Sequence, residues 1–494
     1  MDLVPTGIAG LDTVLRGGLP PNRVYLAEGS PGVGKTTLAL QFLLEGMRRG
    51  EKVLYIALSE SKEEIEAVAK SHGWSLDGMD ILEISALENQ LRIKDTGTLF
   101  HPSEVELQNL VKALLDTIDR LQPARVAFDS LSELRILSDS GLRYRRQLLR
   151  FKQFFMGRGC TVLFLDDSDD KSDVQVRSIA HGVIVLERLA ATYGVERRRL
   201  RVDKVRGLKF QEGNHDYVIE RGGVQVFPRL VALDMGVNFP AESFESGIGE
   251  LDKILGGGIT RGTSTLFLGP AGISKTTLCL QFAFTAAKAG RPVLFFTFEE
   301  NLRVLRQRAK GVGIDIEPLE RNGTLKLQRI DPAEMTPGRF AQLIRAEIER
   351  KAVEIVVIDS LNGYMNAMPD ERFLMLHMHD LLSYLALHGV TTLMTLAQSG
   401  MVGPMSSPAD ITYLADTVVM LRFFEAAGAV KKAISVMKKR STRHEETIRE
   451  FSVDSHGLRV GEPLLHFRGV LTGVPTFTGD SGQMIKERDE LQRR

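Results

Sequence analysis

The sequence lacks the features that mark several broad classes of protein. Its 63 basic residues balance its 63 acidic residues, so a formal net charge of zero gives no overall attraction for nucleic acid. It has only two cysteines, Cys160 and Cys279, both in apolar surroundings, which indicates reduced core residues and excludes a disulfide framework. No uninterrupted apolar stretch reaches the roughly 18 residues of a membrane helix, and the first residues show no signal-peptide pattern. We therefore expect a cytoplasmic protein that does not enter a membrane.

What the sequence does contain is a phosphate-binding loop that occurs twice. The first loop consists of Gly29, Ser30, Pro31, Gly32, Val33, Gly34, Lys35, Thr36 and Thr37. The second runs from Gly269 to Thr277 and includes Gly272, Ile273, Ser274, Lys275 and Thr276. The two lysines are 240 residues apart, and the flank Leu-Gln-Phe at 40–42 returns at 280–282. A hydrophobic fraction of 43% is enough for two cores, so we expect a duplicated nucleotide-binding protein.

Short apolar runs alternate with helical patterns in both copies. In copy one we expect strands at 24–27, 53–58, 125–128 and 161–165, with helices at 36–49 and 103–121. In copy two we expect strands at 265–268, 293–298, 355–358 and 391–395, with a helix at 339–351. This alternation predicts an α/β fold of two tandem domains with mostly parallel central sheets. The expected domains are residues 1–235 and 240–475, followed by a charged tail at 476–494.

Each loop has the residues needed to hold Mg·ATP. Backbone N–H groups of such a loop close on phosphate oxygens at the start of a helix. Lys35 and Lys275 are expected to reach the β- and γ-phosphates, and the hydroxyls of Thr36 and Thr276 to ligate Mg²⁺. Asp129 and Asp359 each end an apolar strand, which is the position of the carboxylate that supports the metal. The alternative, a glycine-rich turn that binds nothing, is hard to reconcile with two loops in register with two such acids.

Hydrolysis also needs a carboxylate that orients the attacking group, and here the copies differ. Copy two has Glu299 and Glu300 after its second strand, whereas copy one has Ser59 and Glu60. A simpler interpretation of these acids is that they cap helix starts. The loops differ as well, because Ser274 stands where copy one has Gly34. Serine there costs on the order of 1–2 kcal/mol if its φ must be positive.

These residues identify a resemblance to the KaiC family, the double-domain RecA-like ATPases that include the cyanobacterial circadian clock protein. The doubled loop, the acid pair at 299–300 and the closing segment at 433–451 carry the resemblance, which covers residues 1 to about 475. It implies a hexameric ring with ATP at subunit interfaces, an ATPase in the first domain and a Ser/Thr autokinase in the second. It also implies a KaiB-like or other signalling protein as a partner.

The resemblance further assigns an interface pair and a phosphorylated segment. Lys204 and Arg206 in copy one, and Lys438 and Arg440 in copy two, would reach the γ-phosphate held by the next subunit. A basic strand end that faces solvent is the alternative. Thr412 and Ser407 are the candidate phosphosites, although Tyr413 occupies the family's second acceptor position.

Two other functions remain open from the sequence. One is a DNA-acting recombinase or helicase on the same scaffold, suggested by arginines near 143–150 that interleave with Phe151, Phe154 and Phe155. The helical spacing of these phenylalanines indicates instead that they face a core. The other is a non-enzymatic scaffold in which ATP only holds a ring together, an alternative that the substitutions at Ser59 and Ser274 keep open.

Overall fold

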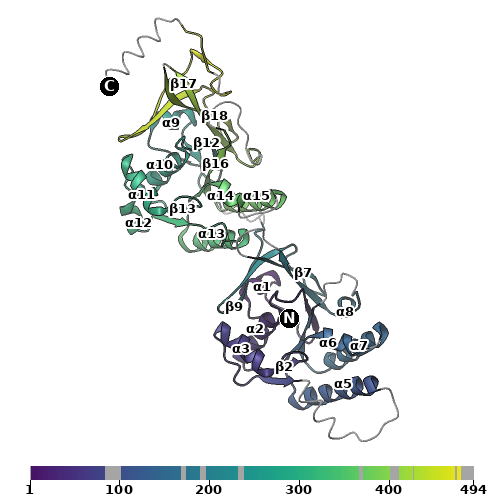
Figure 1. Cartoon of the computed structure of the whole chain (residues 1–494). Helices are drawn as coiled ribbons and strands as arrows, with labels where there is room; N and C mark the ends of the chain where they lie inside the picture. Colours follow the sequence, from purple (N-terminus) through teal and green to yellow (C-terminus); the bar gives the residue numbers. More distant parts are fainter. Residues whose placement is uncertain are drawn as a thin grey trace. The chain divides into compact units, whose positions relative to one another are not determined.

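The computed structural model describes residues 2–83, 102–138, 140–167, 174–189, 196–231, 238–366, 371–400, 411–426, 428–472 and 475–479. Side chains at 102–110, 174, 366 and 371–374 lie outside this description. The chain divides into two compact units, Met1–Arg229 and Leu230–Arg494, which we call unit one and unit two. Each unit is described by itself below (Figure 1).

The helices and strands of unit one alternate through most of its length. In chain order they are α1 (Ala9–Val14), β1 (Val24–Glu28), α2 (Lys35–Arg48), β2 (Val53–Ala57), α3 (Lys62–His72), β3 (Asp80–Glu83), α5 (Pro102–Leu121), β4 (Arg125–Asp129), α6 (Leu131–Ile136), α7 (Gly141–Met156), β5 (Thr161–Asp166), α8 (Val174–Ile179), β6 (Gly182–Leu189), β7 (Arg197–Val205), β8 (His215–Glu220) and β9 (Gly223–Phe227).

The described strands of unit one form one sheet in the order β3-β2-β4-β5-β1-β6-β7-β8-β9. The first six in this order pair in parallel, and β7, β8 and β9 extend the sheet in antiparallel fashion. Because parallel strands begin and end at the same edges, the carboxyl ends of β1, β2, β4 and β5 meet at one edge. A crevice at this edge is where ligands bind in open α/β sheets.

Side chains of the central strands alternate between two cores. Tyr25 and Ala27 of β1 belong to the core that α1, α2 and α3 cover, whereas Val24 and Leu26 belong to the core beneath α5, α6 and α7. Figure 1 shows α2 and α3 on one side of the strands and α6 and α7 on the other. Strands buried on both faces need continuous apolar sequence, which is why these runs were visible in the sequence.

Unit two repeats this arrangement. In chain order its elements are β10 (Ser243–Phe244), α9 (Gly249–Ile254), β11 (Ile259–Thr260), β12 (Ser264–Pro270), α10 (Lys275–Lys288), β13 (Val293–Thr297), α11 (Leu302–Gly311), α12 (Glu317–Arg321), β14 (Leu325–Arg329), α13 (Pro337–Lys351), β15 (Ile355–Asp359), α14 (Leu361–Asn366), α15 (Glu371–Leu387), β16 (Thr391–Gln398), β17 (Thr417–Ala426), β18 (Ala429–Lys439), β19 (Arg449–Asp454), β20 (Gly457–Pro463), β21 (Phe467–Arg468) and β22 (Thr476–Phe477).

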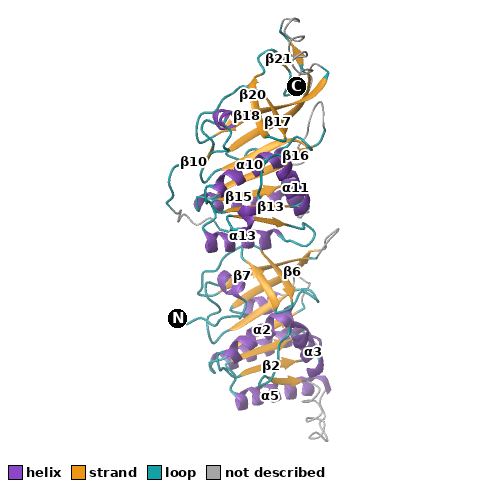
Figure 2. Ribbon diagram, turned by 90° about the vertical axis from the view of Figure 1, so that its left-hand side faces the viewer, coloured by secondary structure: helices purple, strands orange, loops and turns teal. Residues whose placement is uncertain are grey.

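The main sheet of unit two has the order β14-β13-β15-β16-β12-β17-β18-β19-β20, position for position the order of unit one. Figure 2 shows its strands in orange with purple helices packed against them. The predicted class, two tandem α/β domains with mostly parallel sheets, is confirmed. The antiparallel strands were not expected, since β7 reads as an arginine-rich surface run although Leu200 and Val202 are buried in the core.

Candidate nucleotide-binding sites

The phosphate loop of unit one connects β1 to α2 at the carboxyl edge of the sheet. Gly32 and Gly34 adopt left-handed φ values of +82° and +95°, and Gly34 is the residue that caps α2. A Cβ added to Gly34 would lie 2.4 Å from Cδ1 of Ile219 in β8, so a larger residue here would be strained in φ and would have to displace the Ile219 side chain. The loop therefore presents backbone N–H groups at a helix N-terminus, as phosphate binding requires.

Lys35 is buried, and its ammonium group lies over the loop. It donates hydrogen bonds to the carbonyls of Gly29 (2.7 Å) and Ser30 (3.0 Å). It also pairs with Asp167, whose Oδ1 is 2.7 Å from the lysine Nζ. Asp167 directly follows β5 and accepts a hydrogen bond from the Ser132 hydroxyl at 3.1 Å. Burial alone would raise the pKa of Asp167, but the hydrogen bond and charge of Lys35 outweigh it and lower this pKa.

Thr36 and Asp129 meet as a metal site needs them to. The Thr36 hydroxyl donates to the Asp129 carboxylate at 2.9 Å, and the buried hydroxyl of Tyr55 donates to the same oxygen. Burial raises the pKa of Asp129, partly offset by these hydrogen bonds. A buried carboxylate beside a threonine hydroxyl at the loop is the donor set that Mg·ATP uses in this class of loop. These residues therefore fit a Mg²⁺ ion bound with the phosphates.

Glu60 lies close to this carboxylate. Its Oε2 is buried and has no hydrogen-bond partner among the described residues. Burial, followed by the neighbouring charges of Asp129, Glu64 and Asp167, raises the pKa of Glu60. Ser59 beside it is exposed. An unpaired carboxylate oxygen in a group of acids fits a site that also receives a cation or a water molecule.

The loop of unit two has the same path, with serine in the capping position. Ser274 has a φ of +83°, the left-handed value that Gly34 has in unit one. Its hydroxyl accepts a hydrogen bond from Lys432 of β18 at 2.8 Å. The sheet register makes Val453 in β19 the counterpart of Ile219, because Lys432 pairs with Phe451 as Arg198 pairs with Tyr217. Valine lacks the Cδ1 atom that obstructs a Cβ in unit one.

Lys275 donates to the carbonyls of Gly269 (2.9 Å) and Pro270 (2.8 Å), as Lys35 does in unit one. Burial lowers the pKa of Lys275 to about 8. The pairing of β12 with β16 puts Ala397 where unit one has Asp167. The charged partner of the loop lysine is therefore a property of unit one.

The acids of unit two lie around its loop. Asp359 accepts a hydrogen bond from the Thr395 hydroxyl at 2.5 Å. Glu299 is exposed and accepts from the Ser360 hydroxyl at 3.1 Å, and Glu300 accepts from Arg308 at 2.7 Å. Burial raises the pKa of Glu300, although the charge of Arg308 opposes this shift. Both glutamates are thus held at the carboxyl edge of the sheet, and Thr276 lies in the first turn of α10.

The Lys-x-Arg pairs lie at the opposite, amino edge of each sheet. In unit one, Lys204 donates to the carbonyl of Arg177 and Arg206 donates to that of Ser178 at 3.1 Å. In unit two, Lys438 donates to the carbonyl of Thr412 (3.1 Å) and Arg440 to that of Tyr413 (3.1 Å). These matched contacts make Arg177 and Ser178 the unit-one counterparts of Thr412 and Tyr413.

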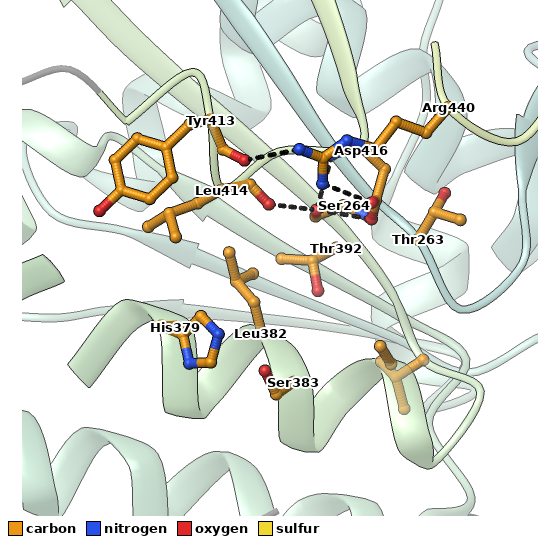
Figure 3. A pocket seen from close by; sticks show the side chains of 12 residues that line it. Thr263, Ser264, His379, Leu382, Ser383, Thr392, Tyr413, Leu414, Asp416 and Arg440 are labelled. Atoms are coloured by element: carbon orange, nitrogen blue, oxygen red, sulfur yellow. Dashed lines mark hydrogen bonds and ion pairs between the residues drawn. The ribbon is translucent and has the colours of Figure 1, made fainter. Parts of the chain in front are cut away.

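Figure 3 shows a cavity beside the pair in unit two. It has a volume of about 440 Å³ and is lined from β12, α15, β16 and the segment before β17. Arg440 and Tyr413 lie along its rim, and Ser264 donates to Asp416 within it at 3.0 Å (Figure 3). The Tyr413 side chain is 55% exposed. The guanidinium of Arg440 and the exposed phenol ring of Tyr413 therefore both line this cavity at the amino edge.

Three other groups of residues were singled out in the sequence. Ser407 lies outside the described residues. Phe151 and Phe155 are fully buried in the unit-one core, which confirms that they face inward and removes them as a stacking surface for DNA bases. Cys160 and Cys279 are both buried and free, as expected.

Among the described residues, no three or more His, Cys, Asp or Glu side chains come together in a group that could hold a metal ion. Within the same residues, no helix has the length and hydropathy of a membrane span.

Three contributors to these sites were missed from the sequence: Asp167, Tyr55 and Lys432. Asp167 follows another aspartate at the end of a strand, and that strand end was the available signal. Tyr55 lies inside an apolar strand and Lys432 in a basic one, so only the register reveals their contacts.

Two phosphate loops, each at the carboxyl edge of a mostly parallel sheet with an acid at the end of a neighbouring strand, define a tandem P-loop ATPase. The family model for the KaiC ATPase matches residues 4–231 and 244–464. The chain therefore belongs to the KaiC family, as the sequence resemblance predicted. Membership of this ATPase family implies that the chain binds nucleotide.

Relatives match over nearly the whole chain. The circadian clock oscillator protein KaiC of Acaryochloris marina (strain MBIC 11017) is 27% identical over 495 residues, which cover 99% of this chain and 93% of that protein. The circadian clock protein KaiC3 of Synechocystis sp. (strain ATCC 27184 / PCC 6803 / Kazusa) is 27% identical, with 97% and 96% covered. The KaiC protein of Synechococcus elongatus (strain ATCC 33912 / PCC 7942 / FACHB-805) is 27% identical, with 99% and 93% covered.

Proposed function

We propose that this protein hydrolyses Mg·ATP at the subunit interfaces of a homo-oligomeric ring, a hexamer by family resemblance. The observation that carries the proposal is the separation of each loop from its Lys-x-Arg pair. Arg206 lies beside the start of β1. Its backbone N–H donates to the carbonyl of His181, and the backbone N–H of His181 donates to the carbonyl of Val24, the first residue of β1. The loop begins five residues later at Gly29, about 16 Å away at roughly 3.3 Å per strand residue.

An arginine side chain does not span that length within one unit. The same holds in unit two. The backbone N–H of Arg440 donates to the carbonyl of Asp416, and that of Asp416 donates to the carbonyl of Ser264 at the start of β12. The loop begins five residues later at Gly269. A guanidinium at the amino edge can therefore complete a phosphate site only on another copy, as a finger supplied in trans does. Head-to-tail contacts of this kind produce rings when they close.

Each side chain has a defined role in the proposed reaction. Lys35 and Lys275 would bind the β- and γ-phosphates, and Thr36 with Asp129 would hold Mg²⁺ in unit one. When bound, Mg²⁺ supplies charge neutralisation at the phosphates. In unit two, Thr276 and Asp359 would hold the ion, and Glu299 and Glu300 would orient the attacking group. Arg206 and Arg440 would stabilise the charge that develops on the transferred phosphoryl group.

Mixing two inactive variants tests action in trans. Every subunit carries Lys275→Ala, so that hydrolysis reports unit one alone. Arg206→Ala subunits keep an intact loop, and Lys35→Ala subunits keep an intact finger. Rings shown by native mass spectrometry to be mixed should recover part of the phosphate release, whereas each variant alone stays inactive. No recovery in mixed rings would argue that Arg206 acts within its own subunit.

We also propose slow autophosphorylation in unit two, with Thr412 as the acceptor or Ser407 in its place. The supporting observation is that Lys438 and Arg440 hold the carbonyls of Thr412 and Tyr413, which ties the acceptor segment to the proposed finger. Unit one has Arg177 in the position of Thr412, and that arginine pairs with Glu28 instead. A signalling or timing role with a KaiB-like partner is the corresponding physiological proposal.

A further inference from the structure

An acid at the end of β5 faces the loop lysine in unit one. Asp167 has one carboxylate oxygen 2.7 Å from Lys35 Nζ, and its other oxygen accepts from Ser132 at 3.1 Å. Its side chain is 37% exposed, so one side of the carboxylate is open to water. Two contacts therefore fix this acid beside the group that takes the terminal phosphate.

The position of Asp167 complements a loss elsewhere in the same unit. Unit two has Glu299 just after β13 and Ala397 near the end of β16, the strand beside the loop strand β12. Unit one has Ser59 at the first of these positions and Asp167 at the second. Each unit thus has one carboxylate that the other lacks, and both carboxylates come from the carboxyl edge of the sheet.

The other two acids near the loop of unit one, Asp129 and Glu60, do not contact Lys35. Asp129 receives hydrogen bonds from Thr36 and Tyr55, the arrangement expected of a metal-supporting carboxylate. Glu60 has the sequence position of Glu300, the second member of the acid pair, and bonds neither Lys35 nor Ser132. Asp167 is the carboxylate that directly contacts the phosphate-binding ammonium group.

We propose that Asp167 is a catalytic residue of unit one that orients the attacking water and accepts its proton, in place of the carboxylate lost at Ser59. The water oxygen forms a new bond to the γ-phosphorus, and the bond from that phosphorus to the β,γ-bridging oxygen breaks. The bridging oxygen leaves with ADP. One proton of the water passes to Asp167, which later releases it to solvent. This inference rests on the proposed hydrolysis of ATP in unit one.

A competing role for Asp167 makes the opposite prediction. If the carboxylate only neutralises Lys35, its removal frees the lysine for ATP and leaves hydrolysis intact or faster. If it acts on water, its removal slows hydrolysis although ATP binds at least as well. Binding and turnover therefore move in opposite directions only for the catalytic role.

The experiment uses the full-length chain with Lys275→Ala as the parent and compares it with Asp167→Asn and with Ser59→Glu/Asp167→Asn. Single-turnover phosphate release measures the chemical step, and equilibrium titration with a non-hydrolysable ATP analogue measures binding. We expect Asp167→Asn to slow phosphate release by about 100-fold or more, with analogue affinity unchanged or several-fold higher. Ser59→Glu restores a carboxylate just after β2 and should make phosphate release at least tenfold faster than in Asp167→Asn alone.

The outcomes separate the two proposals. A parent that binds the analogue but releases no phosphate refutes the proposed hydrolysis in unit one, and the role of Asp167 with it. A parent that turns over, combined with an Asp167→Asn variant within threefold of it, refutes the role of Asp167 alone. If Asp167→Asn loses both analogue binding and phosphate release, Asp167 has a structural role, and the proposal is overturned.

Discussion

Serine at a left-handed capping position makes a quantitative prediction about the loop of unit two. Ser274 has a φ of +83°, where a residue with a Cβ is strained by about 1–2 kcal/mol. The hydrogen bond from Lys432 offsets part of this strain, since such a bond contributes about 0.5–1.5 kcal/mol net. Ser274→Ala keeps the strain and loses the bond, whereas Ser274→Gly loses both.

The two variants should therefore differ from each other more than either differs from the wild type. We expect Ser274→Ala to destabilise the segment by about 1 kcal/mol and Ser274→Gly to be neutral or to stabilise it by up to about 1 kcal/mol. The gap of about 1–2 kcal/mol between them corresponds to roughly 5- to 30-fold in amide protection. Hydrogen exchange by mass spectrometry, on peptides that cover the loop and α10 of the full chain, measures this gap.

Unit one offers the matched control. Gly34→Ser should be more damaging than Ser274→Gly is beneficial, because its Cβ meets Ile219 at 2.4 Å. Adding Ile219→Val to Gly34→Ser removes the obstructing atom and should recover part of the lost protection. Equal protection in Ser274→Ala and Ser274→Gly would refute the strain argument, and no recovery with Ile219→Val would refute the packing argument.

Three further predictions concern nucleotide and phosphate. Lys35→Ala should abolish most ATP binding in unit one and loosen the proposed ring, as measured by nucleotide content and light scattering; unchanged values would contradict this. Burial lowers the pKa of Lys275 to about 8, so ATP affinity of unit two, titrated in Lys35→Ala, should fall by up to about tenfold per pH unit above 8 as the ammonium loses its proton; a flat profile from about pH 7 to 10 would exclude this. Prolonged incubation with Mg·ATP should add phosphate to intact subunits, at Thr412 or, failing that, at Ser407, but not to Glu299→Gln subunits. Wild-type subunits without added mass would end the kinase proposal.

The parts of the fold that could be predicted are those buried on both faces. The central strands need uninterrupted apolar sequence, so the expected strand at 53–58 corresponds to β2 at Val53–Ala57 and that at 355–358 to β15 at Ile355–Asp359. Strand β7 escaped notice because only one of its faces packs on a core, and its other positions carry charged side chains, mostly arginines. The family and fold class followed from the loops, whose residue types are dictated by phosphate chemistry rather than by packing.

The chemistry around the loops was less predictable because it depends on sheet register. Asp129 and Asp359 could be assigned since each ends an apolar run, but nothing local indicates that Asp167 meets Lys35 across the edge of the sheet. The tolerance of Ser274 is likewise invisible locally, because it depends on the exchange of Ile219 for Val453 in a strand about 180 residues further along the chain. Ser274 thus departs from the glycine of the phosphate-loop pattern, but the smaller Val453 leaves room for its Cβ.

The two units differ at matching positions of their main sheets: in the loop, in the acids of the carboxyl edge and in the segment held by the Lys-x-Arg pair. Unit one combines a glycine loop, a carboxylate that contacts its loop lysine, and an arginine at the position of Thr412. Unit two combines a serine loop, a glutamate pair and a threonine whose carbonyl is held by Lys438. A carboxylate that contacts the phosphate-binding lysine suits attack by water, whereas the exposed Glu299 leaves room for a protein hydroxyl to approach. The exchange of acid positions therefore offers a physical basis for the proposed hydrolysis in unit one and the proposed phosphoryl transfer to protein in unit two.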